Sequence, residues 1–175
     1  LALGFSITFV LVYMQNLSGD AQEQENITEG TEEKSVIEPA EEFSLSAPIS
    51  GMVKPVEECE DEVFSSGALG KGVIIEPREG KVFAPCDGEV TNFFETKHAV
   101  GITSNQGAEV LIHVGMDTVT LNGEGFTAHA AVGDKVKKGQ LLLEFDLELL
   151  RKKGLSPVTP VVIAHADDFA HIECC

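Results

Sequence analysis

The sequence predicts an all-β domain, an antiparallel β-sandwich of the barrel-sandwich hybrid type with one or two short helices, preceded by a membrane-helix tail and an acidic linker. From Phe43 onward, short runs of β-branched and apolar residues alternate with turn pairs such as Glu79-Gly80 and Lys138-Gly139. Short strands separated by frequent turns are typical of sandwiches and barrels. Two phrases, 82–90 and 132–141, each combine a tight turn with a strand, and they resemble the two halves of a duplicated hybrid motif.

The first 17 residues are almost wholly apolar. A membrane-spanning helix needs about 20 apolar residues, so this run is slightly short. It starts at Leu1 and not at a methionine. We therefore expect residues 1–17 to be the end of the last transmembrane segment of a longer chain. A buried strand or helix of a preceding domain is the alternative.

Residues 18–42 predict an acidic linker. From Asp20 to Glu42 the chain holds nine Asp and Glu residues against Lys34 alone, with few apolar residues. Such a segment repels itself and buries too little apolar surface to fold. We expect it to be disordered, with a partly helical linker as the alternative. The folded domain then spans residues 43–175, with its motif core at 61–165.

The whole chain of 175 residues has a formal net charge of −17. This charge argues against binding to nucleic acid, which needs a positive surface, and it suits a partner with a basic face. The chain has no Walker A loop, no G-x-S-x-G elbow and no G-x-G-x-x-G fingerprint. Its four cysteines form no C-x-x-C pair, so we expect reduced thiols and not disulfides: Cys59, Cys86, Cys174 and Cys175.

A strand–turn–strand pattern runs from Thr96 to Asp117, with a polar turn at 104–107. A two-residue loop at Asn105-Gln106 would place His98 directly opposite His113, with Cβ atoms about 4.5–5.5 Å apart. A loop of odd length would instead move one histidine to the other face. In the expected register the hairpin is apolar on both faces and buried on both sides, with Val100, Ile102 and Leu111 on one face and Val110, Ile112 and Val114 on the other.

One short helix is predicted late in the chain, at 147–153. Gly154 and Pro157 follow it directly and are expected to end it.

Two opposed imidazoles could hold either a phosphoryl group or a metal ion. A lone histidine on an apolar strand is more often a core residue, but His98 gives His113 a partner. A histidine nitrogen is a competent nucleophile toward phosphorus, and a second imidazole N–H could stabilise the transferred group. Thr96 lies two residues before His98 on the same face, where it could join the site or be a plain strand residue.

Three further residues are candidates for contact with a partner. Asp117 could steer a partner, orient an imidazole or simply end the strand. Met116 and Phe94 fit the core, but they could also form an apolar rim that keeps water away from a transfer site.

Four segments closely resemble glucose-type enzyme IIA domains of the bacterial sugar phosphotransferase system: Thr96 to His98, Leu111 to Val119, Leu121 to Phe126, and Phe145-Asp146. The resemblance covers Phe43 to His165 and implies a β-sandwich fold. It also implies that the residue at His113 receives a phosphoryl group from the phosphocarrier protein HPr and passes it to a cysteine of a IIB domain. By the same resemblance His98 assists transfer and stabilises the phosphate, and Thr96 hydrogen-bonds within the site. No cofactor is implied, although His98 and His113 could bind zinc if a partner completed the site.

The order of segments resembles that of permeases arranged IIB, IIC, IIA, which commonly handle β-glucosides, sucrose or trehalose. The resemblance thus implies a membrane IIC domain in the same chain, a IIB domain in the same or another permease, and a cytoplasmic domain attached to the bacterial cell membrane.

Two other classes share some of these phrases. Zinc peptidases of the lysostaphin type need an H-x-H pair among their ligands, but Val114 and Gly115 follow His113. Biotinyl and lipoyl carriers need a lysine in a tight hairpin, typically flanked by methionines, and neither Lys97 nor Lys135 has that setting.

Overall fold

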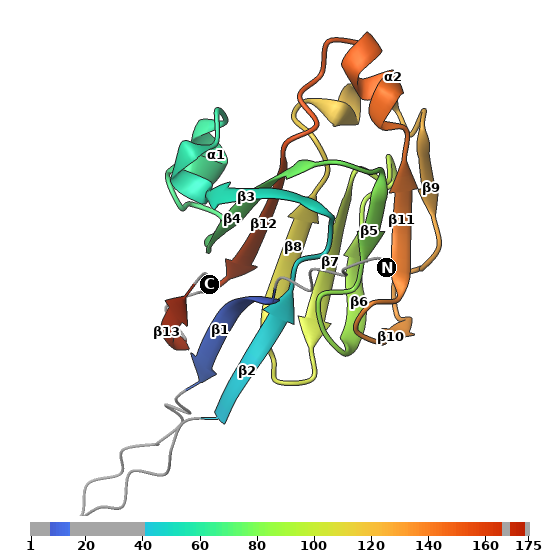
Figure 1. Cartoon of the computed structure of the whole chain (residues 1–175). Helices are drawn as coiled ribbons and strands as arrows, with labels where there is room; N and C mark the ends of the chain where they lie inside the picture. The colour runs from blue at the N-terminus through green and yellow to red at the C-terminus, as the bar shows by residue number, and fades with distance from the viewer. Residues whose placement is uncertain (1–7, 15–40, 166–168, 174–175) are drawn as a thin grey trace, which may run out of the picture.

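The computed structural model of the chain describes residues 8–14, 41–165 and 169–173, and it describes side chains between 44 and 165 (Figure 1). The described strands form three sheets, and each pair of neighbouring strands is antiparallel. The largest sheet has the order β10 (Lys135–Val136), β6 (Gly88–Phe93), β7 (Ala99–Ser104), β8 (Glu109–His113), β12 (Thr159–Ala164), β4 (Lys71–Pro77) and β3 (Gly51–Pro55). A second sheet has the order β5 (Lys81–Phe83), β11 (Leu141–Phe145) and β9 (Phe126–Ala128). The third sheet has the order β13 (Phe169–Glu173), β1 (Thr8–Met14) and β2 (Glu41–Ser46). The predicted antiparallel all-β fold is confirmed.

Strands β7 and β8 pair one residue away from the predicted register. Ala99, and not His98, lies opposite His113. The loop between the strands has three residues, 105–107, and the amide of Ser104 donates to the carbonyl of Ala108 across its base at 2.8 Å. Gly107 has a φ of 89°, the left-handed conformation that ends a three-residue hairpin loop. The predicted two-residue loop at Asn105-Gln106 was therefore wrong.

The same shift regroups the apolar side chains of the hairpin. Four of them, Val100, Ile102, Val110 and Ile112, share one face, and each is at most 1% exposed within the main core. Leu111 points to the opposite face, where it packs against a second apolar cluster made of Val56, Cys59, Phe64, Ile74 and Val162. The hairpin thus packs on both faces as predicted, but the predicted grouping of Leu111 with Val100 and Ile102 was wrong.

The two related phrases lie side by side. Strand β6 pairs with β10, and β5 pairs with β11, so residues 81–90 run antiparallel to residues 135–144. Asp87, in the turn of the first phrase, accepts hydrogen bonds from the Lys137 ammonium at 2.8 Å and from the Lys138 amide at 2.8 Å. The turn of one phrase is therefore fastened by the other.

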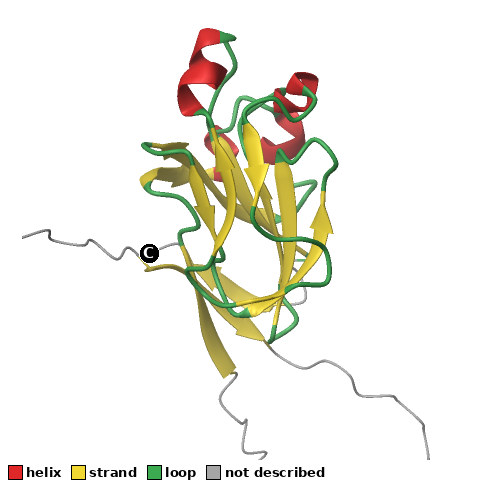
Figure 2. Cartoon of the chain, turned by 90° about the vertical axis from the view of Figure 1, so that its right-hand side faces the viewer, coloured by secondary structure: helices red, strands yellow, loops and turns green. Residues whose placement is uncertain are grey.

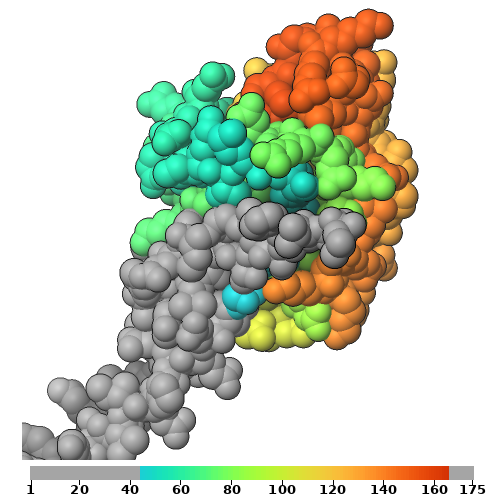
Figure 3. Space-filling view, viewed as in Figure 1, coloured from blue at the N-terminus to red at the C-terminus, as the bar shows by residue number. Residues whose placement is uncertain are grey.

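The helical segments lie together at one end of the sheets (Figure 2). They are η1 (Val56–Glu58), α1 (Glu62–Ser65), η2 (Thr118–Leu121) and α2 (Leu147–Lys152). In the space-filling view the segments around α1 and α2 project on either side of this end (Figure 3). The predicted helix is confirmed as α2, whose first turn is capped by the Asp146 carboxylate accepting from the amide of Leu149 at 2.9 Å. Helix α1 was not predicted.

The apolar N-terminal segment is a strand where the structure describes it. Residues Thr8–Met14 form β1, which pairs with β2 and β13. The rest of 1–17, and the predicted linker as far as residue 40, lie outside the described residues. Glu41 and Glu42, at the end of the predicted linker, belong to β2. Among the described residues, no helix has the length and hydropathy to cross a bilayer.

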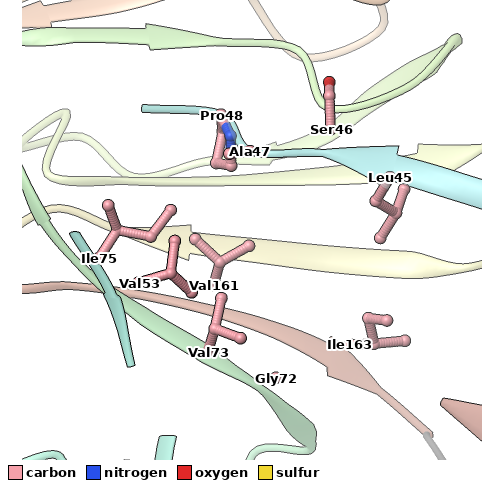
Figure 4. A pocket seen from close by; sticks show the side chains of 10 residues that line it. All are labelled: Leu45, Ser46, Ala47, Pro48, Val53, Gly72, Val73, Ile75, Val161 and Ile163. Carbon is pink, nitrogen blue, oxygen red and sulfur yellow. The ribbon is translucent and has the colours of Figure 1, made fainter. Parts of the chain in front are cut away.

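A narrow apolar groove lies beside the end of β2 (Figure 4). One wall is formed by residues 45–48, and the other walls are formed by residues of β3, β4 and β12: Val53, Gly72, Val73, Ile75, Val161 and Ile163. None of these side chains is an acid or a base, so the groove offers no titratable group for catalysis.

Candidate functional site

His98 and His113 meet at the end of the sheet that carries the helices. Their ring centroids are 4.8 Å apart and the ring planes are inclined by 82°, in an edge-to-face arrangement. His98 is 5% exposed, whereas His113 is partly exposed. His113 is the last residue of β8 and His98 immediately precedes β7. The strands therefore hold both rings at their shared end.

The rings meet although the register does not place them opposite each other. His98 lies outside β7, so the alternation of side chains along that strand does not fix its direction. The preceding residue, Lys97, has a φ of 59°, and its amide donates to the carbonyl of Phe94 at 2.7 Å in the β6–β7 turn. Ala99, opposite His113, carries only a methyl group. The predicted pairing of the rings is thus correct in outcome but not in its geometric reason.

One hydrogen bond fixes the proton of neutral His113. Its Nδ1 lies 2.9 Å from the carbonyl oxygen of Gly115. Because a carbonyl can only accept, Nδ1 carries the hydrogen. The lone pair of the neutral ring is then on Nε2, which is the nitrogen free to act as a nucleophile.

Thr96 holds the ring of His98. The Thr96 hydroxyl oxygen lies 2.5 Å from Nδ1 of His98. When this hydroxyl donates to Nδ1, the proton of His98 is on Nε2 and can be donated onward. The structure therefore brings together Thr96, His98 and His113, as the sequence predicted.

Both imidazoles favour the neutral form. Burial is the main cause that lowers the pKa of His98, with the nearby His113 as a second cause, to about 4. Burial also lowers the pKa of His113, although the Gly115 carbonyl and then the Asp61 and Asp117 carboxylates act in the opposite direction. A neutral imidazole has the lone pair that nucleophilic attack requires, so the pair is ready for such chemistry near pH 7.

Two phenylalanine rings enclose the histidines. Phe94 packs edge-on against His98 with centroids 5.3 Å apart, and it remains 41% exposed. Phe64, on α1, lies against His113 at 5.3 Å and is buried. Exposed valines stand on the neighbouring elements, Val63 on α1 and Val119 on η2. Apolar surface therefore borders the polar nitrogens.

The predicted partner residues occupy different positions. Phe94 is at the site and exposed, as described above. Asp117 is exposed with a φ of 57° and precedes η2. Met116 is only partly exposed and packs against the second apolar cluster. Of the three, Phe94 and Asp117 are the more available to a partner.

Sequence reasoning missed Phe64, Asp61 and the Gly115 carbonyl. Asp61 caps α1, and its carboxylate accepts from the amide of Val63 at 2.8 Å. The sequence does carry a signal for the start of α1: Asp61 stands directly before Glu62, Val63 and Phe64, and an aspartate before such residues is typical of a helix start. Main-chain groups such as the Gly115 carbonyl leave no comparable mark in a sequence.

No group of three His, Cys, Asp or Glu side chains able to hold a metal ion occurs within residues 44–165. Zinc at His98 and His113 would thus need further ligands from a partner. The two described cysteines, Cys59 and Cys86, are free and buried, and burial, with the Asp87 carboxylate as a second cause, raises the pKa of the Cys86 thiol to about 11.

Residues 43–169 match the family described as phosphoenolpyruvate-dependent sugar phosphotransferase system, EIIA 1. The chain is 50% identical over 126 residues to the PTS system glucose-specific EIIA component of Bacillus cereus, covering 72% of this chain and 76% of that protein. It is 48% identical over 143 residues to the PTS system beta-glucoside-specific EIIBCA component of Bacillus subtilis, which covers 82% of this chain but only 23% of that much longer relative.

The fold agrees with a solved structure of the same kind. Glucose permease IIA from Mycoplasma capricolum superposes with a TM-score of 0.68 and 32% sequence identity, covering 74% of this chain and 92% of that one. These matches do not favour the zinc peptidase or the biotinyl and lipoyl carriers. The chain therefore belongs to the EIIA 1 family of the phosphoenolpyruvate-dependent sugar phosphotransferase system, as a glucose-type phosphoryl carrier domain.

Proposed function

We propose that His113 carries the phosphoryl group on Nε2, accepting it from the phosphohistidine of HPr and passing it to a cysteine of a IIB domain. The observation that supports this most directly is the hydrogen bond from Nδ1 of His113 to the Gly115 carbonyl, which leaves the Nε2 lone pair free. In the transfer, this lone pair forms the new N–P bond as the N–P bond of the donor breaks. Nδ1 keeps its proton throughout, and the donor imidazole departs with its own lone pair.

His98 assists this step through its other nitrogen. With Thr96 donating to Nδ1, the Nε2–H of His98 is available to a phosphoryl oxygen beside His113. A positioned donor of this kind stabilises the charge that phosphoryl transfer spreads over the equatorial oxygens. Phe64 and Phe94 keep water from the rings, which protects a phosphohistidine from hydrolysis.

The name of the Bacillus subtilis relative, a beta-glucoside-specific EIIBCA component, supports a membrane permease as the setting. In this proposal the IIA domain lies at the cytoplasmic face of the bacterial cell membrane, and a IIC domain belongs to the same chain. The IIB partner then belongs to the same or another permease.

The acceptor is tested by phosphorylation from labelled phosphoenolpyruvate with enzyme I and HPr. The wild-type domain is expected to take up label, and His113→Ala to take up none. His129→Ala is a matched control, because His129 is exposed and bonds Glu144 at 2.7 Å on another sheet. Full labelling of His113→Ala would refute the assignment.

The assisting role predicts a different defect for His98→Gln. This variant keeps the His113 nucleophile and should still accept label from HPr. It should pass the phosphoryl group to IIB slowly, because the donor to the moving phosphoryl oxygens is altered. Sugar phosphorylation at the wild-type rate by His98→Gln would show that His98 does not assist.

A further inference from the structure

The peptide unit between Gly115 and Met116 is hydrogen-bonded through both of its polar atoms. Its carbonyl accepts from Nδ1 of His113 at 2.9 Å. Its N–H donates to the carbonyl of Ser156 at 2.8 Å, a residue between α2 and β12. The orientation of this one peptide plane thus determines which nitrogen of His113 holds the proton.

Glycine is needed at position 115 for this orientation. Gly115 has a φ of 72°, which L side chains rarely adopt. A Cβ atom there would lie 2.6 Å from Cγ2 of Thr118 and 2.8 Å from the carbonyl oxygen of Ser156. The turn that bears the carbonyl is therefore closely packed against Thr118.

Thr118 fastens this turn from inside the protein. Its side chain is completely buried, and its hydroxyl donates to the carbonyl of Val114 at 2.6 Å. The amide of Val114, in turn, donates to the carbonyl of His98 at 2.7 Å. One buried hydroxyl thus connects the turn after His113 to the main chain of His98.

We propose that Thr118 is a positioning residue for phosphoryl transfer, whose hydroxyl holds the 114–118 turn so that the Gly115 carbonyl keeps the proton of His113 on Nδ1. This inference rests on the proposed role of His113 as the phosphoryl acceptor. Thr118 acts through Val114 and Gly115 and does not touch the phosphoryl group. Without its hydroxyl the turn relaxes, the carbonyl moves away from Nδ1, and part of the His113 population places its proton on Nε2. A ring in that form has no lone pair on the attacking nitrogen.

Three substitutions separate the hydroxyl from the space it fills. Thr118→Ser keeps the hydroxyl and loses the methyl group, Thr118→Ala loses both, and Thr118→Val keeps the volume but loses the hydroxyl. The ¹⁵N chemical shifts of the His113 ring report its tautomer without any phosphoryl donor. Phosphorylation by HPr gives the rate, and thermal unfolding gives the folded fraction of each variant.

Thr118→Ser is expected to match the wild type in tautomer and in rate. Thr118→Ala and Thr118→Val are expected to show a mixed His113 tautomer and a rate lowered about tenfold or more, the size of effect that small misplacements of reacting groups produce. If Thr118→Val fails to fold, the comparison of Ser with Ala still isolates the hydroxyl. A pure Nδ1–H tautomer in a folded variant lacking the hydroxyl would overturn the proposal, as would equal defects in Thr118→Ser and Thr118→Ala. The tautomer is measured without any phosphoryl donor, so these outcomes test the role of Thr118 alone. The proposed role of His113 as acceptor fails separately, if His113→Ala takes up label.

Discussion

At the scale of single residues, burial and a main-chain hydrogen bond determine the protonation of the histidine pair. Burial keeps both rings neutral, and the pKa of His98 falls to about 4. The Gly115 carbonyl then leaves the lone pair of neutral His113 on Nε2, the nitrogen to which we assign the nucleophilic role. Burial and the Gly115 carbonyl thus determine both the charge and the tautomer of His113. Phosphoryl transfer depends mainly on such positioning and on charge.

The lowered pKa of His98 predicts that acid weakens the fold. In the unfolded chain His98 binds a proton near its ordinary pKa of 6.5, whereas in the folded protein it does so only near 4. Between pH 6.5 and pH 4 the unfolded chain therefore binds more protons at His98 than the folded protein does, so acid favours unfolding. The stability that neutral, buried His98 contributes is complete above pH 6.5 and is lost as the pH falls toward 4. The loss amounts to about 3 kcal/mol at most for His98.

Urea unfolding at several pH values across this window measures the effect. His98→Gln is the matched variant, because glutamine does not titrate. The free energy of unfolding should fall less steeply with acid in His98→Gln than in the wild type. Equal slopes in the two proteins would show that His98 does not contribute.

The residues of the site were better predicted than their geometry. His98, His113 and Thr96 could be found because their chemical types and spacing stand out among apolar strand residues. Their register could not, because Asn105-Gln106-Gly107 fits a two-residue loop as well as a three-residue loop with glycine at its end. The two rings meet because His98 lies just outside β7, and the sequence does not show where a strand begins to within one residue.

At the scale of elements, α1 (Glu62–Ser65) matters more to the site than its length suggests. It brings the Phe64 ring against His113, and its cap, Asp61, is one of the carboxylates that raise the pKa of His113. A helix of four residues has no useful hydrophobic periodicity. The strands, by contrast, are short runs of β-branched and apolar residues between turn residues, and they could be predicted.

The two roles of Asp61 can be separated by substitution. Asp61→Asn keeps a capping side chain and removes the charge, so stability should change little while the pKa of His113 falls further. Asp61→Ala removes both and should also cost about 1 kcal/mol of stability. An NMR titration of His113 and chemical unfolding check the two expectations. An unchanged His113 pKa in both variants would contradict the electrostatic role.

At the scale of the whole molecule, the net charge of −17 is the dominant property. It was read directly from composition, and it favours partners with a basic docking face. We expect the apolar border around the histidines to supply contact area for such a partner, and the charge to supply attraction at longer range. These two contributions respond differently to salt.

The rate of phosphoryl transfer from HPr should fall as the salt concentration rises from about 0.05 M to about 0.5 M. Salt shortens the Debye length, which is about 8 Å at physiological ionic strength, and so weakens the attraction between the two proteins. Phe94→Ala removes an exposed, uncharged ring, so it should slow transfer by a similar factor at every salt concentration. Stopped-flow measurement of the transfer gives both curves. A rate independent of salt would mean that the charge of the domain does not guide HPr.

The hydrogen bond between the Met116 amide and the Ser156 carbonyl has a consequence for protein synthesis. The ribosome completes both histidines long before it reaches Ser156. A nascent chain that stops between them has the nucleophile but lacks the acceptor that orients the Gly115–Met116 peptide. It also lacks β12, the strand that pairs with β8 along the edge opposite β7. We therefore expect a chain that ends before Ser156 to hold the Gly115 carbonyl, and with it the proton of His113, less firmly than the complete fold.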